Sequence, residues 1–290
     1  MQETQAKLIL VSGLSGSGKS IALNVLEDAG FNCIDNLPVS LFKTLANDLS
    51  LEQPEQLRLS AIGIDARIPG ADLNKVPELV KQLREHGLAC EILYLEADND
   101  VLIQRFSETR RRHPLTDEHK NLESAIQLER ELLEPLRDAA QLQINTSQTT
   151  LHELRSIIRS RLVDREHGQL SLMLQSFGFK HGPPRNADFV FDMRCLPNPH
   201  WNPELRPLTG HDAPVAMFLE QDQKVDEMFQ AVSQFLAHWV PCFESEGRSY
   251  LTIAIGCTGG QHRSVYMTEK LGRFFAEQGR TCLCTHRELS

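Results

Sequence analysis

The sequence lacks the features that mark membrane and secreted proteins. No segment reaches the run of ~18 apolar residues that a membrane-spanning helix needs. The N-terminus, MQETQAKLILVSG, leads from a polar start straight into a glycine loop and lacks the layout of a signal peptide. The seven cysteines are an odd number without a Cys-x-x-Cys pair, which favours reduced thiols. We therefore expect a cytoplasmic protein without a membrane partner.

The chain also lacks an excess of basic residues and any low-complexity run. Its 30 Lys and Arg stand against 39 Asp and Glu, which gives a formal net charge of −9. A protein this acidic is a poor general binder of polyanions, so any nucleic-acid binding must come from a local basic patch. With 290 residues the chain is long for one hydrophobic core, and we expect two domains.

The first half alternates strand-like and helix-like segments. Apolar runs predict strands at 7–12, 31–35, 59–65, 91–97 and 141–147. Amphipathic patterns predict helices at 19–29, 121–137 and 151–162. Strands that alternate with helices indicate a parallel sheet covered on both faces.

A polar stretch, DREHGQ at 164–169, is a plausible domain boundary, and the pattern changes after it. Strands are predicted at 170–177, 187–193 and 250–256, and a helix at 264–279. Between them, 196–214 carries five prolines and predicts a functional irregular segment. Cys282 and Cys284 in TCLCTH predict one face of a short strand rather than a metal site.

The segment GLSGSGKS at 13–20 fits the pattern G-x-x-x-x-G-K-[ST] between a predicted strand and a predicted helix. Glycines there let backbone N–H groups converge on phosphate oxygens, and the helix N-terminus adds its positive end. Lys19 can reach the terminal phosphates, and Ser20 can bind Mg²⁺. The alternative is a glycine-rich loop without a ligand. The loop residues are Gly13, Leu14, Ser15, Gly16, Ser17, Gly18, Lys19 and Ser20.

Acidic residues follow several predicted strands. Asp35 and Asp65 each end a strand, and Glu96 and Asp98 follow another. The carboxyl ends of parallel strands share one edge of a sheet, so these carboxylates should emerge near the glycine loop. One of them should complete the Mg²⁺ shell beside Ser20, and Asp65 is the first candidate because its strand is the most apolar. For each acid, a helix cap or a turn is an equal alternative.

The segment RFSETRRRHP gathers basic residues in the region where small-molecule kinases carry an arginine-bearing lid over the transferred phosphate. A phosphate clamp is one hypothesis, and a solvated helix end is the alternative. No base for a phosphate acceptor stands out, so a small-molecule kinase is only an alternative function. The residues of this predicted clamp are Arg105, Arg110, Arg111, Arg112 and His113.

A second glycine turn, GCTGGQHRS at 256–264, matches the C-x-x-G-x-x-R-S spacing of a thiol phosphatase. That chemistry needs a cysteine thiolate, which would be Cys257, and an arginine for the phosphoryl group, which would be Arg263. Two features count against it. Gly256 stands where such enzymes carry a histidine, and no separate Asp loop supplies the acid. We keep the phosphatase as the weaker alternative.

The same turn can bind an anion without nucleophilic attack. Thr258 and Gly259 offer hydroxyl and backbone donors, and Arg263 offers its guanidinium to a phosphate. The following helix adds its positive end, and His200 or His262 can add a donor. A plain structural turn is the alternative.

These motifs occur together in one known family. The chain resembles the RapZ family of P-loop proteins, also called the RNase adapter family. The resemblance runs essentially end to end and rests on VSGLSGSGKS, FNCIDNLP, SFGFKHGPPRNADFVFDMRCLPNPHW, LTGHDAPV and SYLTIAIGCTGGQHRSVY. It implies an α/β protein with an N-terminal P-loop kinase-like parallel-sheet domain, which we expect at 1–163. A C-terminal α/β domain with a phosphosugar-type anion site would cover 164–290.

The resemblance also implies the ligands. Family members bind ATP and GTP with Mg²⁺ and have at most weak ATPase or GTPase activity, so we assign no catalytic residue and expect a regulatory binding protein. The metal ligands would be Ser20 and Asp65. The segment aligned with the guanine-nucleotide site is Asp65, Ala66, Arg67 and Ile68. The pocket for glucosamine-6-phosphate would be formed by His200, Thr258, Gly259 and Arg263.

The partners implied by the resemblance are a small regulatory RNA and RNase E, through which the family controls glucosamine-6-phosphate synthase. Members are thought to form homo-oligomers, with a tetramer expected. The RNA-binding branch ends in a basic tail, whereas this sequence ends in HRELS. Fewer cations weaken RNA affinity through reduced counterion release. The basic residues left for RNA at this end are Lys270, Arg273, Arg280 and Arg287.

Overall fold

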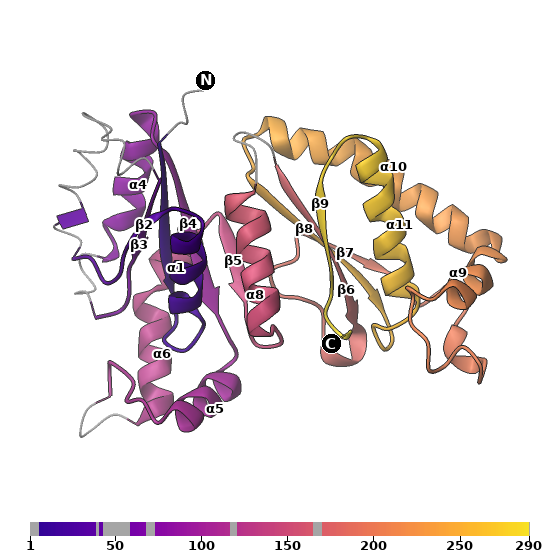
Figure 1. Cartoon of the computed structure of the whole chain (residues 1–290), viewed down its shortest axis with the longest axis horizontal. Coiled ribbons are helices and arrows are strands. Elements are labelled where there is room, and N and C mark those ends of the chain that lie inside the picture. The colour runs from indigo at the N-terminus through magenta and orange to yellow at the C-terminus, as the bar shows by residue number, and fades with distance from the viewer. Residues whose placement is uncertain are drawn as a thin grey trace. The chain divides into compact units, whose positions relative to one another are not determined.

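The computed structural model describes residues 6–38, 41–42, 59–67, 73–116, 121–164 and 170–289. The chain separates into two compact units, Met1–Asp164 and Arg165–Ser290, each built on its own sheet (Figure 1). Among the described residues, no helix is both long and apolar enough to cross a lipid bilayer.

The first unit is built on a five-stranded parallel sheet in the order β2-β3-β1-β4-β5. The strands are β1 (Lys7–Gly13), β2 (Asn32–Ile34), β3 (Leu59–Gly63), β4 (Ala89–Glu96) and β5 (Leu142–Asn145). All seven residues of β1 are buried, as expected for a central strand covered on both faces. The chain crosses from β1 to the edge strand β2, returns to β3 beside β1, and continues on the other side of β1 with β4 and β5. The carboxyl ends of β1 and its neighbours therefore lie where the strand order reverses, which is where α/β sheets bind ligands.

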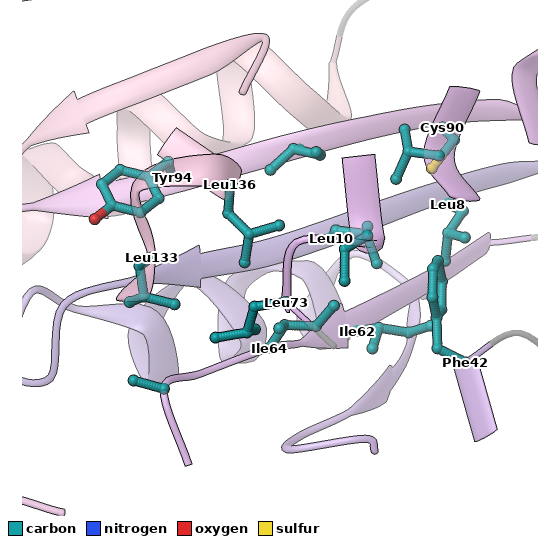
Figure 2. Close-up of a cluster of buried hydrophobic side chains, with 14 of the residues drawn as sticks. Leu8, Leu10, Phe42, Ile62, Ile64, Leu73, Cys90, Tyr94, Leu133 and Leu136 are labelled. Carbon is teal, nitrogen blue, oxygen red and sulfur yellow. The ribbon is translucent and has the colours of Figure 1, made fainter. Parts of the chain in front are cut away.

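Helices cover both faces of this sheet. Helix α1 (Lys19–Asp28) contacts β1, β2 and β3 and packs on α8 (Leu151–Ile158). Helices α4 (Val76–Glu85) and α7 (Glu134–Ala139) contact β4 and each other. Side chains alternate between the two faces of a strand. Leu8 and Leu10 of β1 therefore share one cluster with Leu133 and Leu136, which Figure 2 shows together with Ile62 and Tyr94.

The strands expected in this half are confirmed, but the single helix expected at 121–137 is wrong. The chain forms α6 (Leu122–Leu132) and then the separate α7, with Pro135 in the first turn of α7. Proline has no backbone N–H and clashes with the preceding turn, so it begins a helix more readily than it continues one. The helix expected at 151–162 is α-helical only to Ile158 and ends in a π-helical turn, Arg159–Val163.

The second unit has a four-stranded parallel sheet in the order β7-β8-β6-β9. The strands are β6 (Ser171–Gly178), β7 (Phe189–Asp192), β8 (Tyr250–Cys257) and β9 (Cys282–His286). Helix α11 (Arg263–Glu277) contacts β6, β8 and β9 and lies across the sheet in Figure 1. Helix α10 (Gln223–Ser245) packs on α11 and on α9 (Ala213–Glu220). The expected α/β class is confirmed for both units.

Each unit has a separate hydrophobic core. In the second unit, Leu172, Leu174 and Ile253 of the sheet pack with Leu236 of α10 and Leu271 of α11. None of these residues belongs to the cluster of the first unit. The proline-rich segment at 196–214 is irregular as expected, apart from the short 3-10 helix η4 (Pro199–Trp201) and the start of α9.

Candidate functional site

The glycine loop of the first unit joins the end of β1 to the start of α1. Gly13 has φ 140° and lies so close to β4 that a Cβ would sit 2.0 Å from the carbonyl oxygen of Leu95. Gly18 caps α1 in the left-handed region, with φ 110°. The N–H of Ser17 donates to the carbonyl of Leu14 at 3.0 Å. The backbone is thus folded into the tight turn that a phosphate loop requires.

Lys19 points back across this loop. Its Nζ donates to the carbonyl oxygen of Gly13 at 2.6 Å. Burial lowers the pKa of Lys19, although the charges of Glu129, Asp65 and Asp35 oppose the shift. The ammonium group therefore sits over the loop with acids around it. Ser20, the expected Mg²⁺ ligand, is exposed in the first turn of α1.

Two predicted acids lie at the carboxyl edge of the sheet near Lys19. Asp65 is buried, and its carboxylate accepts the backbone N–H of Arg67 at 2.9 Å and the Nε of Arg67 at 2.9 Å. Burial alone would raise the pKa of Asp65, but these hydrogen bonds and the charge of Lys19 hold it below its ordinary value. Asp35 lies against Gly63, because a Cβ added at Gly63 would lie 2.4 Å from the Oδ1 of Asp35.

The other residues expected around this edge have different surroundings. Ala66 is buried beside Asp65, and Ile68 lies outside the described residues. Glu96 pairs with Arg130 at 3.5 Å. Asp98 occupies the N-cap position of α5 (Asn99–Thr109), but its side chain makes no hydrogen bond to the first turn of that helix.

The carboxylate of Glu129 lies inside the phosphate loop, which the sequence did not predict. Its Oε2 accepts the backbone N–H of Ser15 at 2.8 Å, and its Oε1 accepts the hydroxyl of Ser15 at 2.7 Å. The Nε2 of His113 donates to the same Oε2 at 3.0 Å, and the Nδ1 of His113 accepts the N–H of Leu115. Both Glu129 and His113 are almost fully buried. An internal carboxylate thus satisfies a loop N–H that could serve a phosphate.

The surroundings of Glu129 favour the charged form of its carboxylate. Burial alone would raise its pKa, but hydrogen bonds from His113 and Ser15 and the charge of Lys19 hold the pKa of Glu129 below its ordinary value. No pattern in the sequence distinguishes Glu129, because the same helix also carries Glu123 and Glu131. Only the fold shows which of them turns toward the loop.

The predicted arginine clamp divides into parts with different contacts. Arg105 donates to the carbonyl of Gly16 at 3.0 Å and to the carbonyl of Thr146 at 2.7 Å. It therefore connects the glycine loop to the segment that follows β5. His113 is committed to Glu129. The exposed members of the predicted clamp are Arg110, Arg111 and Arg112.

The second glycine turn connects β8 to α11 and encloses a sulfur atom. The Sγ of Cys257 accepts the N–H of Gly260 at 3.2 Å and lies 3.1 Å from the hydroxyl oxygen of Ser264. Burial alone would raise the pKa of Cys257, but these hydrogen bonds and the charge of Arg263 hold it below its ordinary value. The thiol is nevertheless only 3% exposed, so the turn encloses the sulfur instead of presenting it.

Arg263 is buried at the start of α11 and joins the turn to a neighbouring segment. One terminal nitrogen donates to the carbonyls of Arg194 at 2.9 Å and Leu196 at 3.1 Å, and the other donates to the hydroxyl of Thr258 at 3.2 Å. Its Nε is buried and has no hydrogen-bond partner among the described residues. The guanidinium therefore has a structural role and one donor unused.

The other residues expected to bind a sugar phosphate lie around the same turn. Thr258 is exposed, and a Cβ added at Gly259 would meet nothing within 4 Å. His200 is exposed, and its ring centroid lies 6.3 Å from that of His262. The Nε2 of His262 contacts the carbonyl of Leu205 at 3.1 Å, so this ring is anchored.

An Asp-x-Arg pair beside this turn repeats one from the first unit. Asp192 ends β7, and its carboxylate accepts the backbone N–H and the Nε of Arg194, both at 2.9 Å. Asp65 and Arg67 make the same contacts beyond β3. In each unit the strand carrying the pair neighbours the strand that enters the glycine turn. Sequence reasoning missed the second pair, although Asp192-Met193-Arg194 matches Asp65-Ala66-Arg67 in spacing.

The residues expected to bind RNA are mostly paired with acids. Lys270 lies 3.7 Å from Asp226, and Arg280 lies 2.7 Å from Glu244. Arg287 pairs with Glu288 at 2.9 Å and also donates to the carbonyl of Gly182. The fourth expected residue, Arg273, is exposed on α11.

Comparison with known proteins matches both units to one family. Residues 6–166 match the family described as RapZ-like N-terminal domain, and residues 170–290 match the RapZ C-terminal domain. The chain belongs to the RapZ family. It is 52% identical to a nucleotide-binding protein of Cellvibrio japonicus over 97% of this chain and 95% of that protein. It is 51% identical to a nucleotide-binding protein of Halorhodospira halophila over 98% of this chain and 99% of that one.

Among solved structures, a shikimate kinase from Acinetobacter baumannii in complex with shikimate is similar to part of the chain. It has 19% sequence identity, covers 56% of this chain and 96% of its own, and has a TM-score of 0.39. A likeness this weak says nothing about substrate. The α/β architecture of this RapZ-family protein is defined by its own strand order.

Proposed function

We propose that the first unit binds ATP or GTP with Mg²⁺ at the 13–20 loop. The observation that carries this proposal is the folded strand–loop–helix turn with the Lys19 ammonium held over it. The two relatives with about half of their residues identical are named nucleotide-binding proteins, which supports it. Ser20 and Asp65 would hold Mg²⁺, directly or through water. Asp65, Ala66 and Arg67 are the members of the proposed guanine segment that the structure describes.

The second unit, in this proposal, binds glucosamine-6-phosphate at the turn that follows β8. Exposed Thr258, the open space at Gly259 and the unused Nε of Arg263 support an anion site there. His200 at the rim would contact the sugar. The ion pair of Asp192 and Arg194 adds one negative and one positive charge beside the turn.

At the level of the cell, we propose a cytoplasmic regulatory adapter with at most weak nucleotide hydrolysis. It would bind a small regulatory RNA, act with RNase E on the supply of glucosamine-6-phosphate synthase, and form a homo-oligomer, with a tetramer expected. Membership of the RapZ family supports this role. Exposed Arg273 is the first candidate for RNA contact, since the other predicted cations already have acidic partners.

Calorimetry with Lys19→Ala tests the nucleotide site. We expect the variant to lose more than ~100-fold in affinity for Mg·ATP, because the charge-assisted contact between the Lys19 ammonium and the phosphates is removed. Lys81→Ala, which changes an exposed lysine on α4, is the matched control and should bind normally. Equal affinity of Lys19→Ala and wild type would refute the proposal.

The sugar-phosphate site is tested better at Gly259 than at Arg263, because Arg263 also holds the segment at 194–196. A methyl group at Gly259 would enter open space and leave the fold intact. We expect glucosamine-6-phosphate to raise the melting temperature of wild type and not of Gly259→Ala. A wild type without any shift would end this part of the proposal.

A second function, a thiol phosphatase, is favoured by the contacts of the Cys257 Sγ with the N–H of Gly260 and the hydroxyl of Ser264. Despite burial, these contacts hold the pKa of the thiol below its ordinary value. Its burial counts against nucleophilic attack. Turnover of an aryl phosphate that disappears in Cys257→Ser would establish it. The absence of turnover in wild type would exclude the phosphatase.

The RNA partner is tested by crosslinking in the native cell and sequencing the RNA that is recovered. We expect small regulatory RNA from wild type and much less from Arg273→Glu. Recovery that does not differ from background would overturn the adapter role and leave the nucleotide site untouched.

A further inference from the structure

Two histidines and a glutamate meet in the second unit, outside both glycine turns. His211 precedes α9, Glu269 lies on α11, and His286 ends β9. One ligand atom of each lies within 4.8 Å of the other two. The rings of His211 and His286 meet edge to face, with centroids 4.6 Å apart. Segments that are far apart in sequence thus bring two imidazoles and one carboxylate to one point.

We propose that His211, Glu269 and His286 form a binding site for a divalent transition metal of the zinc class. Two imidazoles and a carboxylate are a ligand set that zinc uses where it keeps a coordination position open. Ligands on tetrahedral zinc stand about 3.3 Å apart. His211 is exposed and can close the remaining gap by rotation of its side chain.

The ring of His286 is already oriented for metal binding. Its Nδ1 lies 2.9 Å from the hydroxyl oxygen of Ser176, which is fully buried and opposite His286 in the β6–β9 register. Its Nε2 lies 3.0 Å from Glu269. When Nε2 binds a metal, the ring proton moves to Nδ1 and is donated to Ser176, whose hydroxyl can act as either donor or acceptor. This is the second partner that metal-bound histidines usually have.

The backbone under His211 is also fixed. The N–H of Gly210 donates to the carbonyl of Gln261 at 2.8 Å, and a Cβ at Gly210 would meet the carbonyl oxygen of His262 at 2.3 Å. Asp212 accepts the N–H of Thr209 at 2.7 Å, which closes the turn. All three ligands therefore project from anchored backbone, so little ordering remains when a metal binds.

The contact between the Nε2 of His286 and the carboxylate of Glu269 does not explain the position of His211. Among the described residues, neither ring nitrogen of His211 has a hydrogen-bond partner, although the ring packs against His286. Solvent reaches the three ligands through His211, which is exposed. Glu269 also lines a cavity of about 430 Å³ with Arg273 and Cys284, which neither histidine lines. A bound metal would join β9, α11 and the 209–212 turn, whose Gly210 contacts the second glycine turn.

The test uses the full-length protein, treated with a chelator and free of nucleotide, in titrations with Zn²⁺ and with Co²⁺. We expect one Zn²⁺ per chain by calorimetry and the intense visible bands of low-coordinate Co²⁺. His211→Ala should lose at least ten-fold in affinity and the bands, and its fold should persist because His211 is exposed. Ser176→Ala should weaken binding by ~10-fold or more through the orientation of His286.

Two controls separate this site from other metal ligands. His152→Ala, at an exposed histidine of α8, should bind Zn²⁺ as wild type does. Cys284→Ser should also bind normally. Full affinity in His211→Ala, or loss of Zn²⁺ in Cys284→Ser alone, would overturn the proposal and point to the thiols. The absence of saturable binding in wild type would overturn it as well. No outcome depends on nucleotide or sugar phosphate.

Discussion

Glu129 and Lys19 together determine the charge inside the phosphate loop. Lys19 brings one positive charge to the carbonyl of Gly13, and Glu129 brings one negative charge to the N–H of Ser15. The second contact resembles the one that a phosphate oxygen would make. A nucleotide phosphate that reaches Ser15 must therefore displace this carboxylate or bind next to it.

This arrangement predicts that Glu129→Gln binds Mg·ATP at least ten-fold more tightly than wild type. Two negative charges a few ångströms apart repel by ~2 kcal/mol or more at an effective dielectric constant of about 20. Calorimetry measures the change. Glu131→Gln, at an exposed site of the same helix, is the control and should show none. Weaker binding by Glu129→Gln would mean that the carboxylate supports the nucleotide site.

The lowered pKa of Glu129 predicts a pH effect on stability. A carboxylate whose pKa falls on folding stabilises the native state above its unfolded pKa, and that contribution is lost as pH falls through the folded pKa. The excess free energy of unfolding of wild type over Glu129→Gln should thus shrink by ~1 kcal/mol or more on acidification below about pH 4.5. Urea titrations at a series of pH values measure it. A constant difference would contradict the account.

Among the elements, α11 and β9 pack closely because Gly272 has no side chain. A Cβ at Gly272 would lie 2.6 Å from the Sγ of Cys284. The role expected for Cys282 and Cys284, one face of a short strand, is confirmed by β9, and this face packs on α11. The thiols therefore act as small core side chains at this contact.

This contact predicts that Gly272→Ala has opposite effects on stability in wild type and in the Cys284→Ala variant. Gly272→Ala should destabilise wild type by about 1 kcal/mol, because overpacking outweighs the gain in helix propensity. In the Cys284→Ala background the clash is absent, so the same change should stabilise by about 0.5–1 kcal/mol. Denaturant unfolding of the four proteins measures both effects. Equal destabilisation in the two backgrounds would show that the sulfur is not the obstacle.

The elements were more predictable than the contacts between them. The strand at 7–12 and the loop at 13–20 follow from local patterns, because an apolar run and fixed glycines each permit few structures. The hydrogen-bond partners of Arg263 do not follow from local patterns, since Arg194 and Leu196 lie almost seventy residues away in sequence. Glu129 could not be told from its neighbours for the same reason. Pro135 indicates a helix start in the sequence. The helical pattern continues on both sides of Pro135, and for this reason a single helix was predicted.

In the whole molecule, the two units carry similar loop motifs on separate sheets. Each has a glycine turn between a strand and a helix, and a neighbouring strand followed by an Asp-x-Arg pair. Each also has its own hydrophobic core. Ligand binding to one turn should therefore first stabilise the core of the unit that carries it.

Scanning calorimetry tests this at the scale of the molecule. Mg·ATP at 100 times its dissociation constant should stabilise the first unit by ~2.7 kcal/mol and raise its transition by about 5–10 °C. The transition of the second unit should respond to glucosamine-6-phosphate instead. Lys19→Ala should abolish the first response and keep the second. A Mg·ATP shift that survives in Lys19→Ala would place the nucleotide outside the loop.

Binding of nucleotide phosphates at the 13–20 loop is tested by a crystal structure with Mg²⁺ and a non-hydrolysable ATP analogue. We expect phosphate oxygens about 2.7–3.2 Å from loop N–H groups and from the Nζ of Lys19. We also expect that the carboxylate of Glu129 has left Ser15. A nucleotide bound elsewhere, with Glu129 still on Ser15 and Lys19 still on Gly13, would contradict binding at the loop.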